Sequence, residues 1–421
     1  MFKKHTLSNG LKIIFVPQKT AKSVTVLVIV GAGSKYEDRL TNGLSHFLEH
    51  MFFKGTKKRP NALKLAETLD KVGGLYNAFT SKEYTGYFAK VEYEYFDLAL
   101  DWVADIFLNS QILQTEINKE RGVIIEEINM YQDTPIQEVE NVWEELLYGD
   151  SPAGWRVIGT KDNILKFQRK DLFNYLKNHY SAKNTIVCLS GNFEEGLALE
   201  RVKKHFRGIA SFDPGSKLRV QEFQAGPQIK IAHKDTDQTH FCLGVRGYSL
   251  ANPKRYIQDI LGVMLGGNMS SRLFIEVREK RGLAYYIHTA SETYTDSGFL
   301  VTQAGVAHRD LSRAVELILK EYKVMAKKEV QSAELKKAKD YLRGALTLSL
   351  ESSDAQASFY GSQELLTGEI LTLPEKLAVI DKITVHDVKN TALEIFQPAN
   401  LNLALIGPRP DENSLQQILK L

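Results

Sequence analysis

The chain has 421 residues, of which 43% are hydrophobic and 25% are charged, and its formal net charge is +3. This is the composition of a soluble globular protein, and the small net charge argues against nucleic acid or an acidic membrane as the main partner. Cys188 and Cys242 are the only cysteines, which excludes a disulfide framework and favours a reducing compartment. The sequence has no apolar run of the roughly 20 residues that span a membrane and no secretory signal core, so we expect a cytoplasmic protein.

The length predicts two domains of about 200 residues each. Hydrophobic periodicity predicts strands and helices throughout the first half. The expected strands are 11–16, 23–30, 75–80, 84–91 and 185–191, and the expected helices are 44–53, 62–71, 94–109, 115–132, 137–147 and 169–178. A polar stretch with several Gly and Pro residues, 209–226, predicts a linker. We therefore expect an N-terminal domain at 1–208 and a C-terminal domain at 227–421.

The stretch 44–53 combines an apolar face with a face that can bind a metal ion. As a helix it buries one side, which consists of Leu44, Phe47, Leu48, Met51 and Phe52. His46, Glu49 and His50 lie on the opposite side, where both imidazoles can reach one ion. Glu49 is not needed as a ligand and is placed as a general base for water. The competing interpretation is a polar helix face with two solvated histidines, which would require no third ligand.

The segment 116–133 offers a third ligand. Its interior-facing helical stripe comprises Ile117, Glu120, Ile124, Glu127, Ile128 and Tyr131. A buried carboxylate is costly without a cation or a donor nearby, so both glutamates on the stripe need a partner. Glu127 can complete a zinc tripod with His46 and His50, and Glu120 is suited to orienting one histidine through its other ring nitrogen. Glu126 is the runner-up ligand, but it points away from the stripe.

The second half of the chain repeats the first. Three residues recur 216 positions later, Asp171, Asn184 and Gly191 as Asp387, Asn400 and Gly407. Tyr76, Ser81, Tyr84 and Thr85 likewise recur 210 positions later, as Tyr286, Ser291, Tyr294 and Thr295. These constant offsets predict one duplicated α+β unit. The second half has Arg272–Glu276 opposite the two histidines, which cannot bind zinc, so we expect one metal site per chain.

The H-x-x-E-H stretch at 46–50, followed by E-x6-E at 120–127, resembles the inverted zinc peptidases of the pitrilysin/insulinase family. The resemblance covers nearly the whole chain, and the length is similar to the half-length branch that includes mitochondrial processing peptidase. It implies an α+β fold of two homologous α/β-sandwich domains, each an antiparallel or mixed sheet covered by helices. It also implies one Zn²⁺ held by His46, His50 and Glu127, with Glu49 as general base and Glu120 supporting a ligand.

In the second half, residues 278–285 match the family's R-E-x-x-G-L-A-Y, between an expected helix at 272–280 and an expected strand at 283–289. Read alone, an Arg and a Tyr near a helix end are usually ordinary surface or core residues. The resemblance implies that Arg278 and Tyr285 reach the substrate, where both are suitable donors to a carbonyl that gains negative charge. Family members close as a clam shell whose two faces come, in half-length members, from different subunits. Because this chain carries both motifs, we expect a homodimer with two composite sites.

The strand at 75–80 resembles the family's edge strand, which pairs with extended peptide substrates. By this resemblance Asn77, Ala78 and Phe79 bind substrate, and the alternative is a plain core strand. In the mitochondrial processing members, acidic residues ten and fourteen positions after the zinc glutamate help to read a substrate arginine. Gln137 and Asn141 occupy those positions here, so we do not expect arginine selectivity.

These features together predict a zinc endopeptidase that hydrolyses short unfolded peptides within an enclosed dimer chamber. Two alternatives remain. The chain could be a catalytically silent structural subunit of a larger complex, as some relatives are, or an enzyme that is active only with a different partner chain.

Overall fold

The computed structural model describes residues 2–408 and 411–421, and within them the chain groups into two compact units. Unit 1 comprises the described residues up to Asn129, together with Arg156–Leu218 and Leu348–Thr372. Unit 2 comprises Met130–Trp155, Arg219–Thr347 and the described residues from Leu373 onward. The units therefore differ from the contiguous domains expected at 1–208 and 227–421. Residues 130–155 belong to unit 2 and residues 348–372 belong to unit 1, because each segment packs on the sheet of the other sequence half.

Unit 1 is built on a mixed sheet with the strand order β1-β2-β6-β3-β5-β4. Its strands are β1 (Lys3–Thr6), β2 (Lys12–Pro17), β3 (Ser23–Val30), β4 (Leu75–Thr80), β5 (Thr85–Glu92) and β6 (Thr185–Gly191). β2 and β6 are parallel, and the other neighbours are antiparallel. The central strand β3 is Val- and Ile-rich and is buried on both faces after its first residue, as its continuous apolar run predicts.

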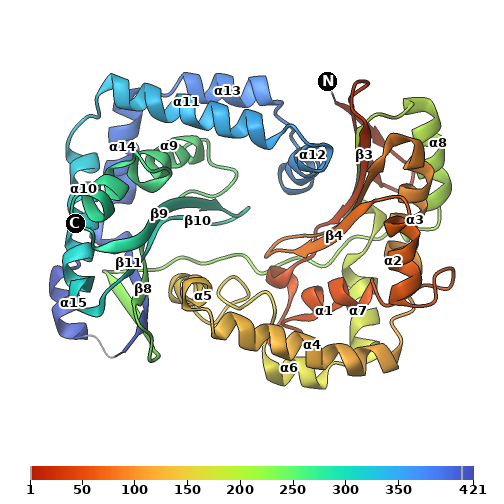
Figure 1. The fold of residues 1–421 in the computed structure, drawn as a ribbon, viewed down its shortest axis with the longest axis horizontal. Coiled ribbons are helices and arrows are strands. Elements are labelled where there is room, and N and C mark those ends of the chain that lie inside the picture. Colours follow the sequence, from red (N-terminus) through yellow and green to blue (C-terminus); the bar gives the residue numbers. More distant parts are fainter. Residues whose placement is uncertain (1, 409–410) are drawn as a thin grey trace. The chain divides into compact units, whose positions relative to one another are not determined.

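Helices cover both faces of this sheet (Figure 1). The helices of unit 1 are α1 (Leu44–Met51), α2 (Ala62–Asp70), α3 (Phe96–Asn109), α4 (Gln114–Gln132), α6 (Lys161–Lys166), α7 (Arg169–His179), α8 (Glu195–Phe206) and α12 (Ser353–Thr367). α3 packs on β3 and β5, whereas α12 packs on β2, β3 and β6. α12 buries Ala357 in an apolar cluster with Ile14, Val16, Leu27, Ile29, Ile186 and Cys188. α4 continues past Asn129 into unit 2.

Unit 2 repeats this plan with the strand order β7-β11-β8-β10-β9. Its strands are β7 (Gln228–His233), β8 (Thr239–Arg246), β9 (Ala284–Thr293), β10 (Gly298–Val306) and β11 (Leu401–Gly407). The order matches β2-β6-β3-β5-β4 strand for strand, and β7 and β11 form the parallel pair. This agreement confirms the duplicated α+β architecture.

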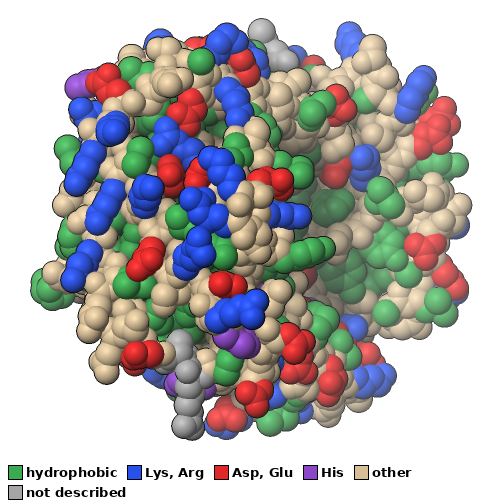
Figure 2. Space-filling view, turned by 60° about the vertical axis from the view of Figure 1, so that its left-hand side comes forward, with side chains coloured by type: hydrophobic (Ala, Val, Ile, Leu, Met, Phe, Trp, Pro, Cys, Tyr) green, Lys and Arg blue, Asp and Glu red, His purple; other side chains and the backbone are tan. Residues whose placement is uncertain are grey.

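The helices of unit 2 are α5 (Pro135–Tyr148), α9 (Arg255–Gly266), α10 (Leu311–Lys327), α11 (Ser332–Ser349), α13 (Leu373–Asp381), α14 (Val385–Ile395) and α15 (Glu412–Ile418). α5 packs on β7, β8 and β11, whereas α9 packs on β9 and β10 (Figure 1). Basic and acidic side chains are mixed on the face of unit 2 that comes forward in Figure 2, although the basic ones predominate there. No helix among the described residues combines the length and the apolar character needed to cross a membrane.

The segment around the expected helix 272–280 departs from regular α-helix. Phe274–Glu279 is a π-helical turn, in which the N–H of Lys280 donates to the carbonyl of Ile275, five residues earlier. A 3.6-residue hydrophobic period cannot predict such a turn, because the π-helix has a different period. The following strand, expected at 283–289, extends as β9 to Thr293.

Candidate metal centre

The helix α1 buries one face and carries two imidazoles on the other. Leu44, Phe47, Leu48 and Met51 are buried beneath it, as the apolar stripe predicted. The side chains of His46 and His50 retain 12% and 19% exposure on the other side of the helix. Their rings meet edge to face, with centroids 4.6 Å apart. The i, i+4 spacing thus places both imidazoles close enough to bind the same ion.

Glu127 on α4 is the acidic side chain that completes this group. Its Oε2 lies 3.7 Å from Nε2 of His46 and 3.5 Å from Nε2 of His50. Ligand atoms of a tetrahedral zinc site are separated by roughly 3.3 Å, given metal–ligand distances near 2.0–2.1 Å. The donor set and its spacing therefore fit a zinc ion. Glu126 is exposed and accepts a hydrogen bond from Asn129 instead, so the geometry favours Glu127 over the runner-up.

Glu120 lies on the same face of α4, two turns before Glu127, and is only 4% exposed. Its Oε1 is 2.8 Å from Nδ1 of His50, and its Oε2 is 2.5 Å from Nζ of Lys54. Glu120 thus contacts His50 through the ring nitrogen that is not the one nearest Glu127, which is the contact needed to orient a metal-binding histidine; that role stays a prediction. Lys54 was not singled out from the sequence, although it follows His50 by four residues, a spacing that could have indicated it.

Glu49 lies beside the two histidines and contacts the end of strand β4. Thr80 donates its hydroxyl hydrogen to Oε2 of Glu49 across 2.5 Å. Burial raises the pKa of the Glu49 carboxyl, and the hydrogen bond from Thr80 partly offsets this effect. Thr80 was missed from the sequence because only the fold brings β4 next to α1.

The pKa values of the two imidazoles are shifted in opposite directions. Burial, reinforced by His50, lowers the pKa of His46 to about 4. Burial also disfavours the charged form of His50, but hydrogen bonds to Glu120 and Glu127 outweigh it and raise the pKa of His50 to about 9. Nδ1 of His46 is buried without a hydrogen-bond partner, so only His50 is oriented by a carboxylate.

Arg278 and Tyr285 are neighbours in unit 2. The guanidinium of Arg278 lies over the rings of Phe274 and Tyr285, 4.9 and 5.6 Å from their centroids. Tyr285 is the second residue of β9, and it is 77% exposed. The structure thus brings the two sequence-predicted side chains together on one exposed surface.

Asn77, Ala78 and Phe79 lie on β4, which pairs with β5 and ends the sheet. β4 is therefore an edge strand, not the interior core strand of the alternative interpretation, and its outer edge has no strand partner among the described residues.

The two positions used to argue against arginine selectivity, Gln137 and Asn141, line a cavity of about 550 Å³ within unit 2. Glu140, Glu144 and Glu292 line the same cavity. Since the sequence argument considered Gln137 and Asn141 alone, the absence of arginine selectivity stays a prediction.

Comparison with known proteins gives consistent matches over the chain. A family model described as Insulinase (Peptidase family M16) matches residues 12–161, and one described as Peptidase M16 inactive domain matches residues 166–342. An uncharacterized zinc protease of Bacillus subtilis is 36% identical over 97% of this chain and 98% of its own length. An uncharacterized zinc protease of Mycobacterium leprae is 34% identical over 99% of this chain and 94% of its own length.

Solved structures share the fold. A protease from Helicobacter pylori aligns with a TM-score of 0.90 and 26% identity, covering 97% of this chain and all of that one. A Pseudomonas fluorescens structure described as a peptidase M16 inactive domain also aligns at 0.90, with 97% of this chain and 98% of that one covered, but at 17% identity it bears on the fold alone.

Proposed function

Because the chain belongs to the insulinase family of peptidases, family M16, we propose that it is a zinc-dependent endopeptidase that hydrolyses short unfolded peptides. The observation that carries this proposal is the convergence of His46, His50 and Glu127, whose ligand atoms all lie within 4.8 Å of one another. Glu49, a carboxylate beside this group that is not one of its ligands, extends the site from metal binding to acid–base chemistry.

The three converging side chains would hold one zinc ion per chain. Bound zinc would supply Lewis acidity that activates water and polarises the scissile carbonyl. Glu120 would keep His50 in its ligand orientation through Nδ1, and Lys54 would hold Glu120 in turn.

Glu49 would act as the general base and then as the general acid. Its carboxylate accepts a proton from the attacking water and returns it to the leaving amine. The raised pKa of Glu49 suits this exchange, because a carboxyl whose pKa lies closer to neutral pH both accepts and releases a proton readily. Thr80 would fix the orientation of the carboxylate through Oε2.

The substrate would bind in extended form along β4. The free edge of this strand can pair with a peptide backbone at Asn77, Ala78 and Phe79, which favours broad sequence specificity. Arg278 and Tyr285 would donate to the carbonyl oxygen as it gains negative charge. We include in the proposal a cytoplasmic homodimer with an enclosed chamber, in which each site combines α1 of one chain with Arg278 and Tyr285 of the other.

The first test measures zinc content and the cleavage of a quenched fluorescent peptide mixture by the purified chain, with and without a chelator. One zinc per chain and chelator-sensitive cleavage are expected. Zinc without cleavage would favour the partner-dependent or silent alternatives, and a chain that binds no zinc contradicts the proposal.

A mixing experiment tests the composite site. Chains with Glu49→Gln and chains with Arg278→Ala should each be inactive, yet equal mixtures that exchange subunits should recover about a quarter of wild-type activity. Random exchange makes half of the dimers mixed. In each mixed dimer, Glu49 of the Arg278→Ala chain meets Arg278 of the Glu49→Gln chain, so one of the two sites is intact. If each site belongs to a single chain, the mixture stays inactive.

A further inference from the structure

The first turn of α1 cannot be capped by the side chain of the residue that precedes the helix. That residue, Gly43, has a φ of 103°, a conformation that side-chain-bearing residues rarely adopt. A Cβ at this position would also lie 2.9 Å from the carbonyl oxygen of Ile158. A serine, aspartate or asparagine cap is therefore excluded, and the backbone N–H groups of the first turn need an acceptor from elsewhere.

Glu37 supplies that acceptor from outside the helix. Its Oε2 accepts from the N–H of Gly43 at 2.8 Å, and its Oε1 accepts from the N–H of Ser45 at 2.7 Å. The side-chain amide of Asn42 donates to Oε2 at 3.1 Å and also to the carbonyl of Arg156 at 3.0 Å. Glu37 is only 3% exposed, and burial raises the pKa of its carboxyl, while the hydrogen bonds from Ser45, Gly43 and Asn42 offset part of that rise. The positive end of the helix dipole also favours the charged form.

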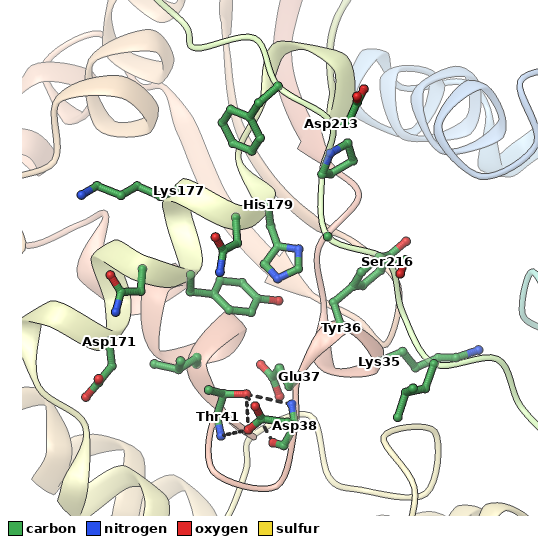
Figure 3. Close-up of a pocket in the computed structure, with 18 residues that line it drawn as sticks. Lys35, Tyr36, Glu37, Asp38, Thr41, Asp171, Lys177, His179, Asp213 and Ser216 are labelled. Carbon is green, nitrogen blue, oxygen red and sulfur yellow. Dashed lines mark hydrogen bonds between the residues drawn. The ribbon is translucent and has the colours of Figure 1, made fainter.

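The loop that carries Glu37 is itself fixed to the turn after β4. The N–H of Ser34 donates to the carbonyl of Ser81, and the N–H of Lys35 donates to that of Lys82. The buried ammonium of Lys35 lies 3.0 Å from Glu83. Figure 3 shows Glu37 beside the turn that joins Asp38 to Thr41, in the wall of a cavity of about 700 Å³. The backbone that precedes Glu37 is thus held by the turn after β4.

This cap matters for one of the two imidazoles in particular. His46 lies in the first turn of α1, whereas His50 lies one turn later. Glu120 orients His50, but Nδ1 of His46 has no hydrogen-bond partner. The position of His46 therefore rests on the backbone of the first turn and on packing. If that turn frays, His46 moves while His50 stays.

We propose that Glu37 is a positioning residue of the metal centre, which fixes the first turn of α1 so that His46 is in ligand position before an ion arrives. This inference rests on the proposed zinc binding by His46. Without Glu37, ordering of the first turn would have to occur during metal binding, and the affinity for zinc would fall by that cost.

The test compares Glu37→Gln with wild type by two measurements. A glutamine has one acceptor oxygen where the carboxylate has two, and its NH2 group would face a backbone N–H. We expect zinc affinity, measured by competition with a chromogenic chelator, to fall about tenfold. In the metal-free protein, amide hydrogen exchange should accelerate at residues 43–46.

Asn61→Ala is the matched control, because Asn61 caps α2 by accepting from the N–H of Lys64. It should accelerate exchange at the start of α2 and leave zinc affinity unchanged. If Glu37→Gln does not fold, Asn42→Ala provides a milder variant. It removes one donor to Glu37 and the bond to the carbonyl of Arg156, but the N–H groups of Gly43 and Ser45 still donate to Glu37.

The inference would be overturned if Glu37→Gln had the zinc affinity and the amide exchange of wild type. It would also be overturned if Asn61→Ala lost as much zinc affinity as Glu37→Gln. If wild type itself binds no zinc, the proposed function fails. The exchange measurement still reports on Glu37 in that case, so the two failures are distinguishable.

Discussion

The hydroxyl of Thr80 donates a hydrogen bond to Oε2 of Glu49. This bond joins the last residue of the edge strand β4 to the helix that carries both histidines. Thr80 directly follows Phe79, which we propose as part of the substrate-binding strand. A peptide bound on β4 and the carboxylate that we propose as the general base would therefore be positioned by one short segment.

Thr80→Val removes the donor and keeps the shape of the side chain. The ionised form of Glu49 loses a stabilising partner, so the pKa of Glu49 should rise further. The acidic limb of the profile of kcat/KM against pH should move to higher pH, and kcat/KM near neutrality should fall about tenfold. Thr347→Val is the control, because the Thr347 hydroxyl donates to the carbonyl of Arg343 within its own helix. An unshifted limb would show that the bond does not tune Glu49.

Glu49→Gln removes the proton acceptor and leaves His46, His50 and Glu127 in place. Peptide cleavage should fall by about 10²–10⁴, because this is the usual contribution of a positioned general base. Zinc content, measured by equilibrium dialysis, should stay at the wild-type level. A variant that loses the metal as well would contradict the role assigned to Glu49.

Lys54→Met removes the ammonium next to Glu120 while keeping the length of the side chain. Glu120 would then hold His50 less firmly, and zinc affinity should fall about tenfold. Lys58→Met is a suitable control, because Lys58 is 59% exposed and pairs with Asp101 instead. Chelator competition gives both affinities, and identical values would remove Lys54 from the site.

His179 predicts a specific dependence of stability on pH. It is 7% exposed, its Nδ1 has no partner, and burial lowers its pKa to about 4 from 6.5. Between these two pH values the unfolded chain binds a proton that the folded chain does not, so stability falls as the pH falls through this window. From pH 7.5 to pH 5 the contribution of His179 amounts to about 2 kcal/mol.

His179→Phe should remove that part of the pH dependence, as measured by urea unfolding at pH 7.5 and pH 5. His386→Phe replaces a histidine whose side chain is 68% exposed and should leave the pH dependence as in wild type. If the free energy of unfolding changes equally for wild type and His179→Phe between pH 7.5 and pH 5, then His179 binds its proton as readily in the folded chain as in the unfolded chain.

The central part of the site could be predicted because its spacing is local. His46 and His50 share one face of a single helix, and Glu120 and Glu127 share one face of another, so periodicity alone orders each pair. The outcome at Glu126 follows from the same rule, since one residue along a helix turns a side chain by about 100°. The duplicated sheet could be predicted for the related reason that constant offsets mark a repeated unit.

The supporting residues could not be predicted in this way. Thr80, Lys54 and Glu37 touch the residues of the site through contacts that exist only after β4, α4 and the loop before α1 have packed together. The sheet on which α5 and α12 each pack could not be predicted either. The amphipathic sequence of α5 specifies that one face is buried, but not which of two similar sheets buries it. The buried face of α12 consists of Ser353, Ala357, Gly361 and Glu364, so its sequence carries no apolar stripe that would indicate burial at all.

The placement of α12 on the sheet of unit 1 has a consequence for how the chain is made. Translation reaches residue 218 well before residues 348–372 exist, so the sheet face that includes Leu27 and Cys188 waits for its cover. At 5–20 residues per second this delay is on the order of ten seconds. During that time the nascent first half exposes an apolar surface, through which it can bind chaperones or aggregate with other chains. A gene truncated after residue 226 would leave this surface without the cover that α12 provides, so we expect the first half to need residues 348–372, in the same chain or added separately, to remain soluble.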